Sequence, residues 1–131
     1  TATYLRTFDL DPALARREGP IYLDLGKAAA MAEVIVNGKS LGILWKPPFV
    51  VEVTGAVRPG ANALEVRVTN TWRNRLIGDR KHPKGFPGAG DLQFKPHLAV
   101  DVGIRADEAL VPAGLIGPVR WLSAVTVELD R

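Results

Sequence analysis

The sequence predicts an all-β fold, an antiparallel β-sandwich of jelly-roll type, and three observations lead to this prediction. Apolar residues recur at every second position in several short runs, as in Leu64, Val66 and Val68, and polar residues alternate with them. Strands with one apolar and one polar face are typical of antiparallel sheets. Asn37-Gly38 separates two such runs and predicts a type I′ hairpin turn, which needs φ > 0 at both positions. The 13 glycines and 10 prolines fit many short strands joined by tight turns.

The expected elements follow from these patterns in chain order. Strands are expected around residues 2–9, 21–25, 34–36, 41–45, 49–53, 64–69, 119–121 and 125–129, with a possible strand at 97–104 and a loop at 105–114. Asp11-Pro12 predicts one helical turn, with Asp11 as its cap. Residues 26–31 are ambiguous, and a short bridge over one end of the sandwich is the preferred interpretation. Glycine and proline are dense over residues 73–96, which favours a long loop, and no helix of ordinary length is expected.

Alternation also predicts which side chains form the core. The expected core comprises Leu23, Val34, Val36, Ile43, Val51, Val53, Leu64, Val66, Val68, Val119, Val125 and Val127. Trp121 alternates with Val119, which favours packing in the core. Trp45 is in phase with Ile43, which also favours the core, although the end of a strand can reach a loop-built site. Trp72 has core parity but polar neighbours, so core and surface positions are equally favoured.

Length and composition restrict the class of protein. A chain of 131 residues without an internal repeat predicts one domain, residues 1–131, excised from a larger protein. There is no cysteine, so no disulfide stabilises the fold, and no apolar run is long enough to predict a membrane span. Five lysines and arginines lie between residues 73 and 84, opposed by Asp79 alone. Because this segment lacks interleaved aromatic residues, a solvated loop is favoured over a nucleic-acid site.

The histidines, serines and carboxylates of the chain do not have the sequence spacing that is typical of a catalytic or metal-binding site. His82 and His97 lie apart and have no cysteine or acidic partners at zinc-binding spacing. No serine nucleophile motif occurs, and no pair of carboxylates is suggested by spacing, although Asp24 and Asp79 are the hardest acids to dismiss. The sequence therefore predicts no catalytic residue, no metal site and no cofactor.

Aromatic and polar residues at strand ends suggest a different chemistry. A sugar is bound by an aromatic face against its C–H surface, together with amide and charged groups that contact its hydroxyls. Such side chains meet at loops that a rigid sandwich positions. We expect a carbohydrate-binding site built from Trp45, Lys46, Trp72, Arg73, Asn74 and Asp79.

Several segments also resemble a known family. The chain is similar to the galactose-binding-like jelly-roll domain of family 2 glycoside hydrolases in residues 4–8, 21–26, 32–42, 48–54, 59–70 and 114–120. The strings Trp45-Lys-Pro-Pro-Phe49 and Asn70-Thr-Trp-Arg-Asn-Arg-Leu-Ile-Gly-Asp79 resemble more closely the C-terminal domain of bacterial family 106 α-L-rhamnosidases.

The resemblance implies a non-catalytic carbohydrate-binding module of a secreted or periplasmic enzyme that degrades plant polysaccharides. The catalytic carboxylates of such enzymes lie in another domain, so no catalytic residue is transferred to this chain. The implied partners are a plant cell-wall polysaccharide or oligosaccharide and the catalytic domain of the same chain, with no nucleic acid, no membrane and a monomeric state. The alternative is a structural accessory domain that packs against the catalytic domain and has little sugar affinity of its own.

Overall fold

The computed structural model describes residues 1–16, 19–82 and 103–124, and these fall into two compact units. The first comprises residues 1–70 together with the segment from residue 113 onward, and we call it the β-sandwich unit. The second comprises residues 71–112, and we call it the helical unit. The two units are described separately below.

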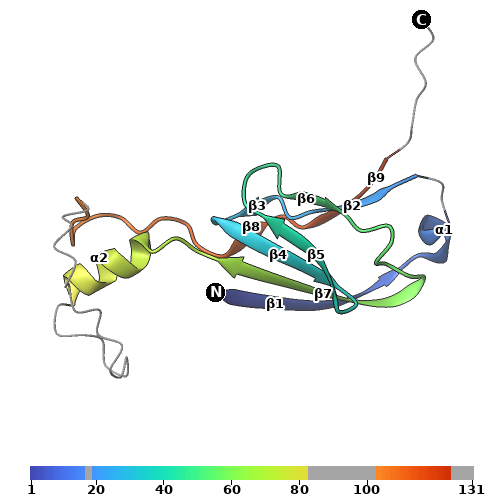
Figure 1. The fold of residues 1–131 in the computed structure, drawn as a ribbon, viewed down its shortest axis with the longest axis horizontal. Helices are drawn as coiled ribbons and strands as arrows, with labels where there is room; N and C mark the ends of the chain where they lie inside the picture. Colours follow the sequence, from blue (N-terminus) through green and yellow to red (C-terminus); the bar gives the residue numbers. More distant parts are fainter. Residues whose placement is uncertain (17–18, 83–102, 125–131) are drawn as a thin grey trace, which may run out of the picture. The chain divides into compact units, whose positions relative to one another are not determined.

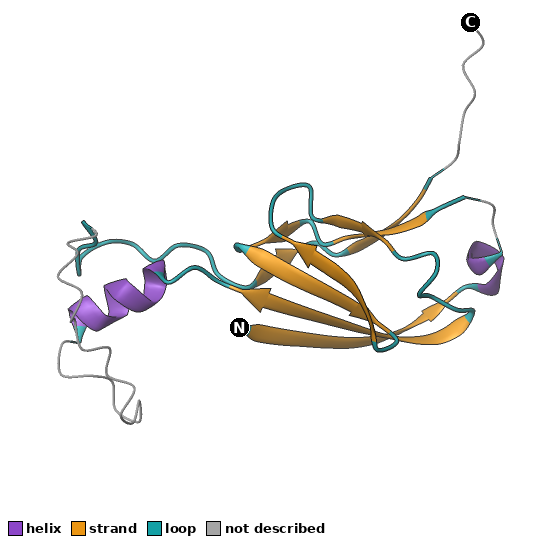
Figure 2. Ribbon diagram, viewed as in Figure 1, coloured by secondary structure: helices purple, strands orange, loops and turns teal. Residues whose placement is uncertain are grey.

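The β-sandwich unit contains two antiparallel sheets and a short strand pair (Figures 1 and 2). The four-stranded sheet has the order β1 (Ala2–Leu10), β7 (Gly60–Thr69), β4 (Met31–Val36) and β5 (Lys39–Leu44). The three-stranded sheet has the order β6 (Val50–Glu52), β2 (Ile21–Asp24) and β9 (Arg120–Ser123). Strand β3 (Lys27–Ala28), in the segment predicted to bridge one end of the sandwich, pairs with β8 (Leu115–Gly117). The all-β sandwich prediction is confirmed.

The core lies between the two sheets and contains most of the predicted residues. Leu23, Val34, Val36, Val53, Leu64, Val66 and Val68 are buried, as predicted. Val51 and Trp121 are half-buried and pack against this cluster, and the ring centroids of Trp121 and Phe8 are 4.5 Å apart. The core also includes Leu10, Ile21, Leu25, Ala28, Ala32 and Phe49, which were not in the predicted set.

A β-bulge in β5 makes the prediction for Ile43 wrong. Glu33 pairs with Ile43, but Ile35 pairs with Ser40, so two residues of β5 oppose the single residue Val34. Gly42 lies in this bulge with φ 102°, a conformation that favours glycine. An extra residue reverses the alternation of side chains beyond it. Ile43 therefore faces away from the core and is 60% exposed.

The predicted core position of Val119 is also wrong, because the strand that was to bury it begins one residue later. Strand β9 pairs with β2 only from Arg120 onward, where Arg120 opposes Asp24 and Trp121 opposes Leu23. Val119 precedes this pairing and is exposed. Val125, Val127 and the strand predicted around them lie outside the described residues, as does most of the possible strand at 97–104.

The predicted helical turn is confirmed as α1 (Pro12–Ala15), with the Asp11 side chain accepting a hydrogen bond of 2.7 Å from the N–H of Ala13. In the helical unit, the loop predicted from residue 73 onward is wrong over its first part, because Arg73–Lys81 forms α2. The prolines of this segment begin only at residue 83. An ion pair between Arg75 and Asp79, four residues apart, supports the helix. Residues 105–112 contain neither helix nor strand, as predicted.

Truncation of Val66 to alanine is expected to lower the free energy of unfolding by about 1–3 kcal/mol, because it leaves a cavity in a packed core. Val66 is almost fully buried on β7, where β1 and β4 pair on either side. Chemical denaturation would measure the change. The matched control is Ile43→Thr on the exposed side of the bulge, which we expect to change stability by less than about 0.5 kcal/mol. Equal losses in both variants would contradict the observed placement of Ile43.

Candidate functional site

The corner after β5 presents one of the two most exposed tryptophans of the described residues. Trp45 is 67% exposed, so the core position that its phase favoured is wrong, for the same reason as for Ile43. The Nζ atom of Lys46 lies 5.2 Å from the Trp45 ring centroid, within range of a cation–π interaction. The corner is anchored by Phe49, which is buried in the core and accepts a hydrogen bond of 2.9 Å from the N–H of Leu25. An indole face is thus held at the surface beside a cation.

The second tryptophan lies in the helical unit, at the start of α2. The sequence favoured a core and a surface position equally for Trp72, and the structure has it at the surface, with 66% of the residue exposed. Its carbonyl accepts a hydrogen bond of 2.9 Å from the N–H of Leu76, so the first turn of the helix fixes its backbone. Ile77 on the same helix is buried. This helix therefore positions an exposed aromatic residue next to the polar side chains that follow it.

Those polar side chains already have partners inside the helical unit. Arg73 forms an ion pair with Glu108, whose other carboxylate oxygen accepts a hydrogen bond of 2.8 Å from the N–H of Arg105. Asn74 donates to the carbonyl of Val111 at 2.8 Å and accepts from the N–H of the same residue at 2.9 Å. These contacts attach the segment around residues 105–111 to the helix.

Asp79 likewise has a partner, since its Oδ1 lies 2.9 Å from Nε of Arg75. The six predicted site residues thus divide between the units: Trp45 and Lys46 belong to the β-sandwich unit, and the other four belong to the helical unit. Trp45 and Lys46 are adjacent in the first unit, and Trp72, Arg73 and Asn74 are consecutive in the second, whereas Asp79 lies farther along α2. The combined site stays a prediction.

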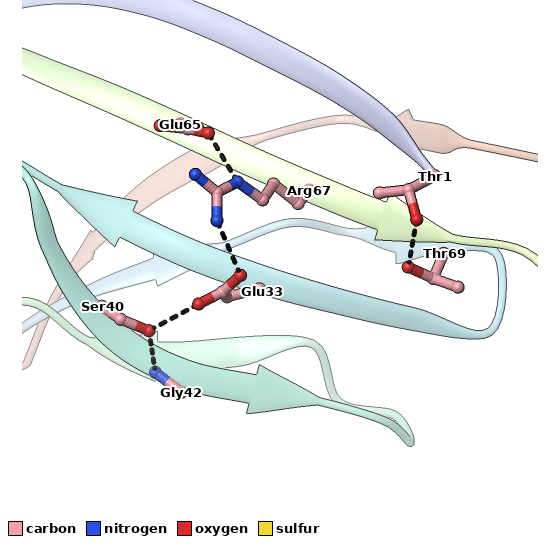
Figure 3. A network of polar contacts seen from close by, with 7 residues as sticks. All are labelled: Thr1, Glu33, Ser40, Gly42, Glu65, Arg67 and Thr69. Atoms are coloured by element: carbon pink, nitrogen blue, oxygen red, sulfur yellow. Dashed lines mark hydrogen bonds and ion pairs between the residues drawn. The ribbon is translucent and has the colours of Figure 1, made fainter.

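The outer face of the four-stranded sheet carries a polar network that the sequence analysis did not single out (Figure 3). Arg67 donates to Glu65 at 2.6 Å and to Glu33 at 3.4 Å, and Ser40 donates to Glu33 at 2.9 Å. The hydrogen bond to Glu65 raises the pKa of Arg67 above its ordinary value. The cross-strand register accounts for the contact between Arg67 and Glu33, because these two residues directly oppose each other on β7 and β4.

Apolar side chains surround this polar network. Leu5, Ile43 and Met31 are exposed and share the outer face by their pairing with Glu65, Glu33 and Thr69. A shallow hollow of ≈ 450 Å³ lies at one end of the face, lined by Leu5, Arg6, Thr7, Ile35, Gly38, Ala63, Leu64 and Glu65. Leu5 follows the expected alternation, whereas Ile43 joins this face only through the bulge. The sheet is therefore not a purely polar surface.

In the helical unit, a hydrogen bond from Arg105 lowers the pKa of Asp107 below its ordinary value. This pair is formed above that pKa and is lost as the pH falls through it. Within residues 1–16, 19–82 and 103–124, no group of three histidine, cysteine or acidic residues is placed to hold a metal ion. No helix among these residues is long and apolar enough to cross a membrane.

The antiparallel sheets of the β-sandwich unit have the architecture of a galactose-binding-like β-sandwich. The chain belongs to the glycosyl hydrolase 2 galactose-binding domain-like family, whose sequence pattern matches residues 1–117. The resemblance seen in the sequence is thereby confirmed.

Two relatives show how this domain occurs in longer proteins. A Formosa agariphila protein with the provisional name beta-glucuronidase is 41% identical over 135 residues, which cover 92% of this chain and 12% of that protein. The solved structure of a rhamnosidase from Novosphingobium sp. PP1Y is 42% identical, with a TM-score of 0.70, over 91% of this chain and 10% of that chain. The chain thus corresponds to a small part of each relative.

Replacing Asn74 by alanine is expected to release the segment around Val111 from α2, because both hydrogen bonds to that backbone are lost. Alanine has the higher helix propensity, so the helix itself should not be weakened. Hydrogen exchange would show a faster rate at the Val111 amide and an unchanged or slower rate within α2. An unchanged Val111 amide would contradict the role assigned to Asn74.

Proposed function

We propose that this chain is a non-catalytic carbohydrate-binding module of a longer, bacterial, plant-polysaccharide-degrading glycoside hydrolase, secreted or periplasmic. The observation that carries the proposal is the exposed and anchored Trp45 ring with Lys46 beside it. A large aromatic face at the surface is suited to contact a ligand, because its burial against an apolar ligand surface is favourable. Lys46 supplies a hydrogen-bond donor at the ring for a sugar hydroxyl or carboxylate.

The parent enzyme is proposed to be an α-L-rhamnosidase. The proposal is supported by the similarity to the Novosphingobium rhamnosidase structure and by the Trp45–Phe49 and Asn70–Asp79 strings. The Formosa agariphila protein that is provisionally named beta-glucuronidase has nearly the same sequence identity to this chain. A glucuronidase parent is therefore the competing possibility. The catalytic groups of either parent would lie outside this chain.

Trp45→Ala is expected to weaken glycan binding by about tenfold, or about 1.4 kcal/mol, through loss of the stacking face. The unsubstituted chain should bind oligosaccharides with dissociation constants from about micromolar to about millimolar. Titration calorimetry on a panel of plant cell-wall oligosaccharides would measure both values. Trp72→Ala, measured in parallel, tests the helical unit's contribution in the same way.

Two controls make this test decisive. Leu122→Ala, an exposed apolar truncation on β9, should leave binding unchanged. Trp45→Ala and Trp72→Ala should also keep the parent melting temperature, because both rings are mostly exposed. Full binding by a folded Trp45→Ala chain would remove Trp45 from the site, and an absence of binding by the unsubstituted chain would refute the module's proposed function.

A second candidate function, a structural accessory domain, is favoured by the outer face of the four-stranded sheet. That face exposes Leu5, Ile43 and Met31, and its central charged groups, Arg67, Glu65 and Glu33, are hydrogen-bonded to one another. Exposed apolar groups around a satisfied polar centre suit contact with another protein surface. The proposed occupant is the catalytic domain of the same polypeptide, because each relative is many times longer than this chain.

Leu5→Ser is expected to destabilise this domain within a polypeptide that also carries the catalytic domain, and to leave the separate chain unaffected. Leu5 is 75% exposed in the chain itself, so only docking would bury it. Scanning calorimetry of both forms would measure the shift in melting temperature. Leu122→Ser, on the other sheet, is the matched control. Equal shifts for Leu5→Ser in both forms would exclude docking on this face.

A further inference from the structure

The side chain of Asn37 is held by three hydrogen bonds that fix which of its atoms donates. Its Nδ2 donates to the carbonyl of Ala56 and to Oδ1 of Asn62, both at 2.8 Å. Its Oδ1 accepts a bond of 3.0 Å from the N–H of Ala63. Asn37 and Gly38 form the hairpin turn with φ values of 51° and 80°, as the sequence predicted, and both are exposed.

The side chain of Asn62, which pairs with Asn37, is held in one orientation and cannot rotate to pair with a different side chain at position 37. Asn62 is 3% exposed, and its Nδ2 donates to the carbonyls of Arg58 and Gly60, both at 2.7 Å. Its Oδ1 also accepts a bond of 2.9 Å from the N–H of Arg58. The Asn62 oxygen therefore points at Asn37, and so does the Ala56 carbonyl, which can only accept. Position 37 must present a donor to this pair of acceptors.

We infer that Asn37 is a site of spontaneous deamidation that the folded hairpin suppresses and that unfolding opens. An asparagine followed by glycine is open to this reaction, because glycine has no side chain to block its own backbone nitrogen. The Gly38 nitrogen gives up its proton and attacks Cγ of Asn37, a C–N bond forms, and Nδ2 leaves as ammonia. Water then opens the resulting succinimide to aspartate or isoaspartate, with no change of oxidation state.

The fold opposes the first step, because Cγ can turn toward the Gly38 nitrogen only after the three side-chain hydrogen bonds of Asn37 break. The reaction thus follows the population of locally opened chains. Its products cannot restore the closed hairpin. An aspartate carboxylate would face two acceptor oxygens, and isoaspartate lengthens the backbone of a two-residue turn whose geometry sets the register of β4 and β5. Each deamidation that takes place while the hairpin is open is thereby a permanent chemical change.

The test compares the folded 131-residue chain with a synthetic peptide of residues 33–41 in the same mildly alkaline buffer. Peptide mapping by mass spectrometry follows conversion at Asn37, and Asn62 and Asn70 of the same sample serve as internal references. We expect Asn37 to react at least about tenfold more slowly in the folded chain than in the peptide, equivalent to an opening free energy above about 1.4 kcal/mol. Equal rates would overturn the inference.

A second measurement tests the product. Asn37→Asp should lower the melting temperature further than Asn37→Gly, because glycine removes the hydrogen bonds and keeps the turn, whereas aspartate adds a charge against two acceptors. Raising the pH from below to above the aspartate pKa should widen this gap, since only the ionised form lacks a donor. An Asn37→Asp chain as stable as the parent at neutral pH would overturn the proposed irreversibility.

Discussion

The contact between Asn37 and Asn62 is the interaction on which the order of the β-sandwich unit depends. Strand β7 turns Asn62, Leu64, Val66 and Val68 toward the core, so its first inward position holds a polar side chain where an apolar one is expected. Burying an amide is unfavourable unless all its polar atoms are paired. Asn62 meets this requirement with backbone groups of its own loop and with the hairpin between β4 and β5. The start of the central strand, a loop and a hairpin are thereby joined at one point.

The sequence was sufficient where local alternation and turn chemistry decide the structure. Strands β2, β4 and β7 appear where period-two patterns predicted them, because each has one face in the core over much of its length. Strand β1 also appears where predicted, although only Phe8 and Leu10 near its end contact the core. The sequence was insufficient where one extra residue in a strand reverses which side chains face the core. The bulge at Gly42 moved Ile43 from the core to the surface, and a glycine in a strand is compatible with either outcome. Helix α2 was not predicted, because glycine and proline are dense over residues 73–96 taken as a whole. The prolines of that segment, however, begin only after the helix ends.

The candidate site shows a second limit of local reasoning. The residues near Trp72 were correctly interpreted as polar and charged, but their partners are more than thirty positions away: Glu108 for Arg73 and Val111 for Asn74. No local pattern predicts pairs at this separation. The exposure of Trp45 depends in turn on the bulge, so the aromatic part of the site also follows from a feature outside its own motif.

These pairings determine what kind of recognition the chain can offer. No buried side-chain nitrogen or oxygen of the described residues lacks a hydrogen-bond partner, so this part of the interior holds no polar group awaiting a ligand. Arg73, Asn74 and Asp79 are engaged within the helical unit, and a sugar hydroxyl would have to compete with those bonds for them. The indole rings of Trp45 and Trp72 are about two-thirds exposed, so a ligand could bury part of their surface area.

At the proposed carbohydrate site, aromatic surface would lead the binding, and Arg73, Asn74 and Asp79 could bond a sugar only by giving up a partner within the protein, so the expected affinity is modest. Binding of this kind also tolerates variation in the pattern of hydroxyl groups, because few polar groups are left unpaired when a hydroxyl is missing. Such a module suits a polymer that offers the same binding surface many times along its length, where weak sites act together through effective concentration.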